Sequence, residues 1–272
     1  MKFWRLATTC IFSLLSFNSS AALLERQDGQ AYYDDVLNIT WLGDANFGAT
    51  ENFGVAGITS GTYLVGSNNG VVLTEIGGGM SHDVAQNWIV AMNASNNGGG
   101  YLEVDTWRLP TASPVNGIEY NYNFFSKNGS YDTGYNISAS GTIYAGSTAS
   151  ELAHLFYNTL GNEALYDINS NPTDCVIDIT SGLSCLTNSG PFQNLYDHAN
   201  VYWTDVETST DEALGFTMQT GQQWEEVRVY TGRAWAVADG DVFVSTVPVP
   251  AAIWLFGSGL IGLVGIARRK KL

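Results

Sequence analysis

Two cysteines are the residues of this sequence whose chemistry is easiest to anticipate. Cys175 and Cys185 are close in sequence, and the remaining cysteine, Cys10, lies in an N-terminal segment with the features of a signal peptide. Cysteine pairs of exported proteins enter an oxidising compartment, where disulfides form and persist. We therefore predict a disulfide between Cys175 and Cys185, which the chain-entropy treatment values at about 3 kcal/mol. Two free thiols or a metal site are the alternatives.

A loop rich in carboxylate and amide side chains precedes the first of these cysteines. Asp167, Asn169 and Asn171 occupy positions 1, 3 and 5 of a calcium-loop pattern, and Asp178 occupies position 12. Pro172 stands where the helical hand requires glycine, and an aspartate at position 12 is shorter than the bidentate glutamate of that motif. A helical-hand site is therefore not expected. A looser calcium site with oxygen ligands and a plain polar loop held by the disulfide both remain open.

Side chains that could act in catalysis are present but scattered along the chain. The sequence has no G-x-S-x-G, H-E-x-x-H, P-loop or G-x-G-x-x-G motif. The histidines are isolated from one another, at His82, His154 and His198. The adjacent carboxylates Asp34-Asp35 and Glu225-Glu226 would point to opposite faces of a strand, so solvated charge is the expectation for them. We predict a non-catalytic protein without a cofactor, calcium excepted, and a secreted polysaccharide hydrolase is the alternative.

The balance of charge excludes one large class of partners. The chain has 26 acidic and 11 basic residues. Six of the basic residues lie within residues 1–22 or 268–271, so residues 23–246 hold five basic residues against all 26 acidic ones, a net charge of −21. Nucleic-acid binding requires clustered lysine and arginine side chains that contact phosphates. We therefore expect no nucleic-acid partner.

The N-terminus has the three parts of a secretory signal peptide. Lys2 and Arg5 precede an apolar run at residues 11–17, and small residues follow at 19–22. A basic start, a short apolar run and small residues at the cleavage site are typical of a cleaved export signal. We predict that residues 1–22 are removed by cleavage after Ala22. A buried N-terminal helix is the alternative.

A proline motif, an apolar segment and a basic end follow one another at the C-terminus. The proline motif comprises Val247, Pro248, Val249 and Pro250. Residues 251–267 contain no charged side chain, and as a helix they would extend about 25 Å, just enough for a thin bilayer. The basic end comprises Arg268, Arg269, Lys270 and Lys271. We predict a transmembrane helix whose basic end is cytoplasmic, which places residues 23–246 on the other side of the membrane.

This three-part tail, residues 247–272, resembles the PEP-CTERM (or VPLPA-CTERM) sorting signal. The resemblance implies an exosortase-type transpeptidase as a partner, which cuts near the proline motif and passes the protein to the cell surface or an exopolysaccharide matrix. Val249 stands where the commonest form has glutamate, so the sortase subtype stays open. The implied location is the inner membrane of a Gram-negative-type bacterium for the precursor, then the cell surface or matrix. A permanent anchor is the alternative.

Between these ends, residues 23–246 have the length of one domain with insertions. Apolar spacing predicts one helix from residue 83 that stops at 96–100, and a capping box at Thr148 to Glu151 predicts a second over 152–160. Alternation predicts strands at 36–42, 201–204, 214–219, 226–230, 234–238 and 242–247. Asp239-Gly240 predicts a hairpin between the last two. The glycine-rich segment 43–79 is expected to form loop and a short hairpin with strands at 63–65 and 71–76. The expected fold class is α+β, with a twisted, largely antiparallel sheet.

Several motifs in this segment resemble, in their order, Lcl-C-like domains, which are related to C-type-lectin-like folds. The motifs are ITWLGDANF at residues 39–47, DTWRLPT at 105–111, VYWTDVE at 201–207 and AWAVADGDV at 234–242. The resemblance implies a lectin-like fold but no settled activity. Two features depart from the family pattern: Thr106 separates Asp105 from Trp107, and an insertion rich in glycine and asparagine runs over residues 116–146.

The WRLPT motif can also be interpreted from its residues alone: Trp107, Arg108, Leu109, Pro110 and Thr111. The indole provides a large ring for the core, and the proline stops a strand. Arg108 is one of five cations among 26 acids, so we expect it to pair with a carboxylate. A ligand-facing Arg108 is the alternative.

These observations predict an exported cell-surface or matrix protein that is sorted by its tail and contacts an extracellular glycan or matrix component. A polysaccharide hydrolase and a passive envelope component are the alternatives. Most of the tryptophans fall on apolar faces and are expected in the core, and Trp224 is the one expected at the surface. A carboxyl pair in a cleft would favour hydrolysis, whereas exposed aromatic rings on a shallow face would favour binding.

Overall fold

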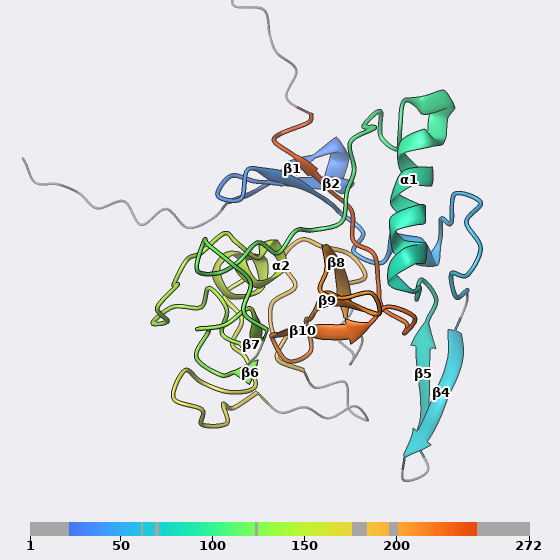
Figure 1. The fold of residues 1–272 in the computed structure, drawn as a ribbon. Coiled ribbons are helices and arrows are strands. Elements are labelled where there is room, and N and C mark those ends of the chain that lie inside the picture. The colour runs from blue at the N-terminus through green and yellow to red at the C-terminus, as the bar shows by residue number, and fades with distance from the viewer. Residues whose placement is uncertain are drawn as a thin grey trace, which may run out of the picture.

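The computed structural model describes residues 22–60, 62–68, 71–122, 125–175, 184–195 and 201–243. These residues form two sheets, a separate two-stranded hairpin and two helices (Figure 1). The fold class is therefore α+β, as the sequence predicted. The single predicted sheet is divided in two: the three N-terminal strands pair with the last strand, and the strands between residues 125 and 227 form a sheet of their own.

The first sheet joins the beginning of the described chain to its end. It consists of β1 (Leu23–Arg26), β2 (Ala31–Asp34), β3 (Ile39–Leu42) and β11 (Val237–Asp239), in the order β1-β2-β3-β11. All neighbouring strands are antiparallel. Trp41 of β3 packs against Trp235 with ring centroids 4.7 Å apart, and both rings are fully buried. This aromatic contact connects the two ends of the domain within the core.

The second sheet supports the surfaces discussed below. Its order is β6 (Phe125–Ser126), β7 (Thr133–Tyr135), β10 (Gln222–Val227), β9 (Glu212–Thr217) and β8 (Tyr202–Glu207). The β6–β7 pair is parallel and the other pairs are antiparallel. The separate hairpin consists of β4 (Thr62–Asn68) and β5 (Val71–Ile76) and extends from the body of the molecule (Figure 1).

Both helices begin at serine caps. Helix α1 (His82–Gly98) starts after Ser81, whose side chain accepts a hydrogen bond from the Val84 backbone N–H. Helix α2 (Glu151–His154) starts after Ser150 in the same way and continues as a π-helical turn over Leu155–Thr159. Short 3-10 turns lie at Gln27–Gly29 and Phe47–Ala49. The second predicted helix therefore exists, but only its first turn is α-helical.

The core contains most of the tryptophans, as predicted. Their indole rings are at most 2% exposed, and they are Trp41, Trp88, Trp107, Trp203 and Trp235. Four of these five indole N–H groups donate to a backbone carbonyl, as Trp107 does to Tyr101 at 3.0 Å, whereas Trp41 Nε1 has no acceptor among the described residues. Trp224, which we expected at the surface, is half-buried against the core, and its indole donates to Glu226 at 3.1 Å.

The strand predictions differ from the structure mainly at the ends of the sheets. β1, β2, β6 and β7 were not predicted, and the strand expected at 226–230 lies earlier, at Gln222–Val227. The predicted hairpin at Asp239-Gly240 does not form within the described chain, because β11 pairs with β3 and residues 241–243 form no strand. Residues 244–247 of its second strand lie outside the described residues.

None of the helices in the described ranges is long and apolar enough to cross a membrane. The predicted signal peptide, residues 1–22, falls on undescribed residues except for Ala22. The predicted transmembrane helix and basic end, residues 251–271, and the proline motif lie wholly outside the described residues.

Candidate functional site

Arg108 holds three segments together. Its guanidinium donates to both carboxylate oxygens of Glu151, at 2.9 and 2.7 Å, and to Asp239 Oδ1 at 2.6 Å. Glu151 Oε2 also accepts a hydrogen bond from the Thr111 backbone N–H at 2.8 Å. The side chain of Glu151 is 7% exposed, so its charge depends on this pairing. The predicted pairing of Arg108 with a carboxylate is confirmed.

The other residues of the WRLPT motif pack in the core or bond to neighbouring segments of the fold. Trp107 and Leu109 are buried. The backbone of Trp107 is held by the side chain of Asn93, which accepts from its N–H and donates to its carbonyl oxygen. Pro110 presents its carbonyl oxygen to the Asp205 N–H at 3.0 Å. The motif therefore connects helix α1, strand β11 and the start of α2 to the second sheet.

A cavity of about 370 Å³ opens beside the cysteine pair, and we call it the disulfide pocket. Its apolar lining includes Ala139, Ala164 and Ile168. Its polar lining includes Asn136, Ser140, Tyr157, Asn162, Glu163, Tyr166, Asp167 and Thr173. Such a mixture of apolar surface with amide, hydroxyl and carboxylate groups can hold a small polar ligand in a fixed orientation.

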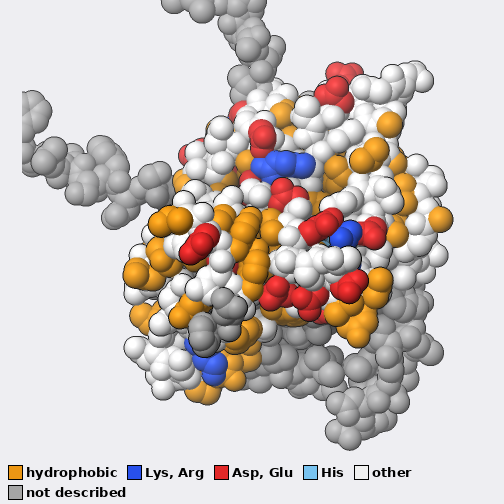
Figure 2. Space-filling model, viewed as in Figure 1, with side chains coloured by type: hydrophobic (Ala, Val, Ile, Leu, Met, Phe, Trp, Pro, Cys, Tyr) orange, Lys and Arg blue, Asp and Glu red, His pale blue; other side chains and the backbone are white. Residues whose placement is uncertain are grey.

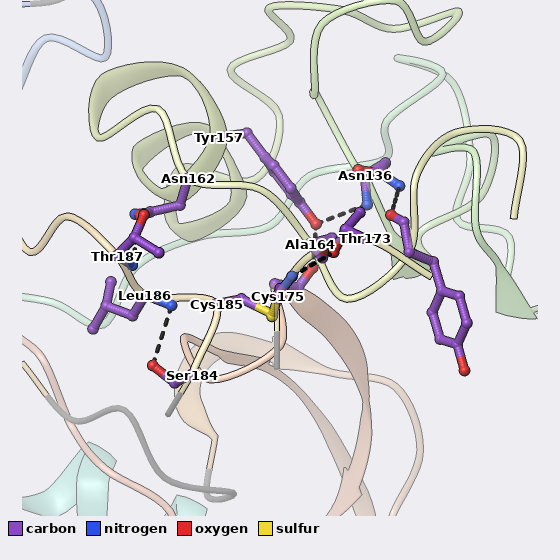
Figure 3. Close-up of a disulfide and its surroundings, with 12 residues drawn as sticks. Asn136, Tyr157, Asn162, Ala164, Thr173, Cys175, Ser184, Cys185, Leu186 and Thr187 are labelled. Atoms are coloured by element: carbon purple, nitrogen blue, oxygen red, sulfur yellow. Dashed lines mark hydrogen bonds between the residues drawn. A yellow bond between two sulfur atoms is a disulfide. The ribbon is translucent and has the colours of Figure 1, made fainter. Parts of the chain in front are cut away.

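The disulfide between Cys175 and Cys185 braces one wall of this pocket (Figure 3). The two Cα atoms are 5.1 Å apart, within the range of natural disulfides. On one side of the bond, Thr173 donates from its hydroxyl to the Ala164 carbonyl at 2.6 Å. On the other side, Asn162 Oδ1 accepts from the Thr187 N–H at 3.0 Å. Two pocket residues, Asn162 and Thr173, are thus fixed from the two ends of the disulfide.

The inner end of the pocket is a closed hydrogen-bond network. Tyr157 donates from its hydroxyl to the Gly221 carbonyl and accepts from the Asn136 N–H at 2.8 Å. Asn136 donates from Nδ2 to the carbonyl oxygens of Lys127 and Tyr166, at 2.7 and 2.8 Å. Burial raises the pKa of the Tyr157 hydroxyl, so this group stays protonated at physiological pH. These groups shape the pocket and are already engaged with one another.

The groups nearer the surface are freer to meet a ligand. Glu163 and Ser140 are exposed pocket residues, so a carboxylate and a hydroxyl are accessible from solvent. The ring of Tyr166 carries the ammonium group of Lys127 at 3.3 Å from its centroid. The opening of the pocket therefore offers acceptors, a donor and an aromatic side chain.

The loop predicted as a weak calcium candidate lies at this opening. Asp167 Oδ1 accepts from the backbone N–H groups of Asn169 and Asn171, each at 2.8 Å, and Oδ2 accepts from Asn171 Nδ2 at 3.0 Å. The hydrogen bonds from Asn171, and then those from Asn169, lower the pKa of Asp167. Within the described ranges, no group of three or more His, Cys, Asp or Glu side chains could hold a metal ion. Asp178 lies outside them, so calcium binding stays a prediction.

A second surface feature, in the predicted insertion, was not anticipated. The rings of Tyr120 and Tyr122 stack with centroids 5.2 Å apart and planes inclined by 19°. Tyr120 is 42% exposed. The sequence signal was the alternation of tyrosine with asparagine at residues 120–123, which puts alternate side chains of an extended segment on one face. We call Tyr120, Tyr122, Asp205 and Glu225 the tyrosine face.

The two histidines in the described part of the chain are buried, and each has a ring nitrogen beside a backbone carbonyl oxygen. His82 is buried, its Nε2 lies 3.0 Å from the Thr204 carbonyl, and burial lowers its pKa. His154 is buried, with Nδ1 3.0 Å from the Ser147 carbonyl. His198 lies outside the described residues. Asp34, expected to be solvated, is buried instead, because it accepts hydrogen bonds from two backbone N–H groups and from Thr159.

Comparison with known families found one match, which lies at the C-terminus. Residues 246–271 match the PEP-CTERM protein-sorting motif. No curated protein and no solved structure matches the chain. The predicted relation of the central segment to C-type-lectin-like domains therefore stays a prediction. The matched residues contain the proline motif, the apolar segment and the basic end, and they mark this chain as an exported protein with a PEP-CTERM sorting motif, processed by an exosortase-type enzyme from a membrane-anchored precursor.

Proposed function

We propose that this exported protein reaches the cell surface or extracellular matrix and binds a glycan there, in the disulfide pocket, without cleaving it. The observation that carries the proposal is the pocket itself, whose volume of about 370 Å³ is within the range of small-ligand sites.

The lining of the pocket suits a sugar ring. Sugars present apolar C–H faces and a rim of hydroxyl groups, so a site for them needs apolar contact together with hydrogen-bond acceptors and donors. The apolar contact comes from Ala139, Ala164 and Ile168. The hydrogen-bonding groups come from Glu163 and Ser140. Since the disulfide and its neighbours already fix Asn162 and Thr173, little of the pocket wall has to be ordered on binding.

The hydrogen bonds of Asp167 argue against this pocket residue as the general acid of a hydrolase. Glycoside hydrolysis by two carboxyl groups needs one of them protonated at working pH, so its pKa must be raised. The pKa of Asp167 is lowered instead, by hydrogen bonds from Asn171. Those bonds also engage both of its oxygens, so we propose that ligand binding in the pocket does not depend on calcium.

One carboxyl group outside the pocket favours the hydrolase alternative. Burial raises the pKa of Asp205, as a general acid requires. If the purified protein released reducing sugars from a polysaccharide, and Asp205→Asn abolished that release, hydrolysis would replace binding as the function.

Replacement of Glu163 with glutamine tests the pocket. We expect Glu163→Gln to weaken binding of a responsive oligosaccharide about tenfold, because a charged acceptor for sugar hydroxyls is lost. Isothermal titration against neutral and acidic oligosaccharides, with and without calcium, measures the change. Glu103→Gln is the matched control, because Glu103 is also an exposed glutamate and lies in the turn after α1. Equal affinities for both variants and the unaltered protein would exclude the pocket as the site.

The sorting motif gives a prediction about the mature protein. We expect protein released from the surface of the native host to lack residues 251–272, because the exosortase cuts near the proline motif. Mass spectrometry of the C-terminal peptide measures this. A chain with Pro248→Ala and Pro250→Ala should keep its tail and stay in the membrane fraction. An intact tail on the surface-released protein would instead indicate a permanent anchor.

A further inference from the structure

The tyrosine face is built before any ligand arrives. Asp132, which is buried, accepts from the Asn121 N–H at 2.6 Å, between the two stacked tyrosines. The same carboxylate accepts from the Val115 N–H at 2.7 Å, and the Asp132 carbonyl accepts from Gln223 Nε2 of β10 at 2.8 Å. The segment with the stacked rings is therefore fixed against the second sheet, and a ligand would not have to order it.

Carboxylates from two strands border these rings. Glu225 of β10 is paired with Leu214 of β9, and Thr204, next to Asp205 in β8, donates from its hydroxyl to the Leu214 carbonyl at 2.8 Å. Since β9 lies between β8 and β10, the Asp205 and Glu225 backbones are about 10 Å apart. Burial raises the pKa of both tyrosines. The negative charge of Asp205 raises the pKa of Tyr120 further, and that of Glu225 raises the pKa of Tyr122 further.

Neighbouring cations offset only part of this negative charge. Arg108 is engaged by Glu151 and Asp239, and that group of three carries a net charge of −1. Arg228, at the end of β10, is likewise engaged by Asp83 and Glu207. Figure 2 shows acidic side chains gathered over the β8–β10 region of this face, with hydrophobic side chains beside them. The face therefore combines an exposed aromatic surface with unbalanced negative charge.

We propose that the tyrosine face is a second binding site, for an oligosaccharide of amino sugars that carry free ammonium groups. A sugar ring packs on the exposed Tyr120, and the ammonium groups pair with Asp205 and Glu225. The tyrosine rings also attract the cation through their negative faces. Anionic polysaccharide is repelled by the same carboxylates. This site shares no residue with the disulfide pocket, so a test of one site does not decide whether the other binds a ligand.

The test compares glucosamine oligomers with N-acetylglucosamine oligomers of the same length, at a pH where the free amines are protonated. Titration calorimetry of the purified protein should show binding of the glucosamine oligomers alone, weakening as salt is added. Asp205→Asn combined with Glu225→Gln should reduce the affinity about tenfold, since each partly exposed ion pair contributes up to about fivefold. Tyr120→Ala should reduce it further.

Matched variants separate binding at the tyrosine face from binding elsewhere on the protein. Tyr230→Ala removes a tyrosine that is 59% exposed in the turn after β10, and Glu163→Gln alters the disulfide pocket. Both should leave the affinity for glucosamine oligomers unchanged. Equal binding of the acetylated oligomers, or undiminished binding by the Asp205 and Glu225 variant, would overturn the proposal. A lysine oligomer is the control for charge. If it bound as tightly as the glucosamine oligomers, and Tyr120→Ala had no effect on their binding, the proposal would also be overturned, because charge alone would account for the affinity.

Discussion

Replacing Arg108 with methionine is expected to lower the free energy of unfolding by about 3 kcal/mol. Methionine keeps the apolar stem of the side chain, so the change isolates the guanidinium group. Its loss leaves the carboxylate of Glu151, only 7% exposed, without its cationic partner. A buried charge that has lost its partner costs more than the net value of the pair. Urea denaturation, followed by tryptophan fluorescence, measures the difference.

Arg228→Met is the matched control for this change. Arg228 also contacts two carboxylates, Asp83 and Glu207, but these are 62% and 43% exposed. Water can solvate them after the arginine is removed, so we expect a loss below about 1 kcal/mol. Adding Glu151→Gln to Arg108→Met should recover part of the lost stability, because the uncompensated charge disappears. If Arg108→Met cost no more than Arg228→Met, Arg108 would be a surface residue free to face a ligand.

The contrast between these arginines shows what composition can and cannot predict. The shortage of cations among 26 acids indicated that Arg108 would be paired. The identity of its partners could not be derived, because Glu151 and Asp239 are 43 and 131 residues away in the chain. Pairing over such separations depends on how β11 returns to β3, and the sequence pattern instead suggested a local hairpin at Asp239-Gly240. Within the described residues, β11 pairs with the distant strand β3 and no hairpin forms at this turn.

Elements with strong local signals were predicted well, and those positioned by distant contacts were not. Helix α1 begins one residue before its predicted start at residue 83, and α2 begins at Glu151, although Ser150 caps it rather than Thr148 of the predicted capping box. The four-residue strand β1 has no comparable local pattern and exists through its pairing with β2. The sequence predicted the cysteine pair and pointed to the Asp167 loop, both of which border the disulfide pocket, but it predicted no pocket there. Residues such as Asn136 and Tyr157 carry no sequence signal for a pocket, since their role arises from mutual contact.

The disulfide provides the second large effect. Replacing both Cys175 and Cys185 with serine is expected to lower the free energy of unfolding by about 3 kcal/mol, because the unfolded chain regains the freedom of a closed loop. The same change should weaken oligosaccharide binding in the disulfide pocket by more than Glu163→Gln does. Denaturation and titration calorimetry measure the two effects. Peptide mapping without reductant should show the cysteines linked in the secreted protein, and free-thiol labelling of the folded protein would contradict the bond.

The effect on binding follows from the way the bond is placed. Thr173 and Asn162 are fixed from opposite ends of the disulfide, so without it the wall between them is held only by hydrogen bonds. Each such bond contributes about 1 kcal/mol, less than the covalent link it would have to replace. The tyrosine face is held by other contacts, from Asp132 to the Asn121 N–H and from Gln223 to the Asp132 carbonyl. Binding of glucosamine oligomers should therefore survive in the folded double serine variant while binding in the pocket declines. An equal decline at both sites would indicate general loosening of the domain rather than a brace for one pocket.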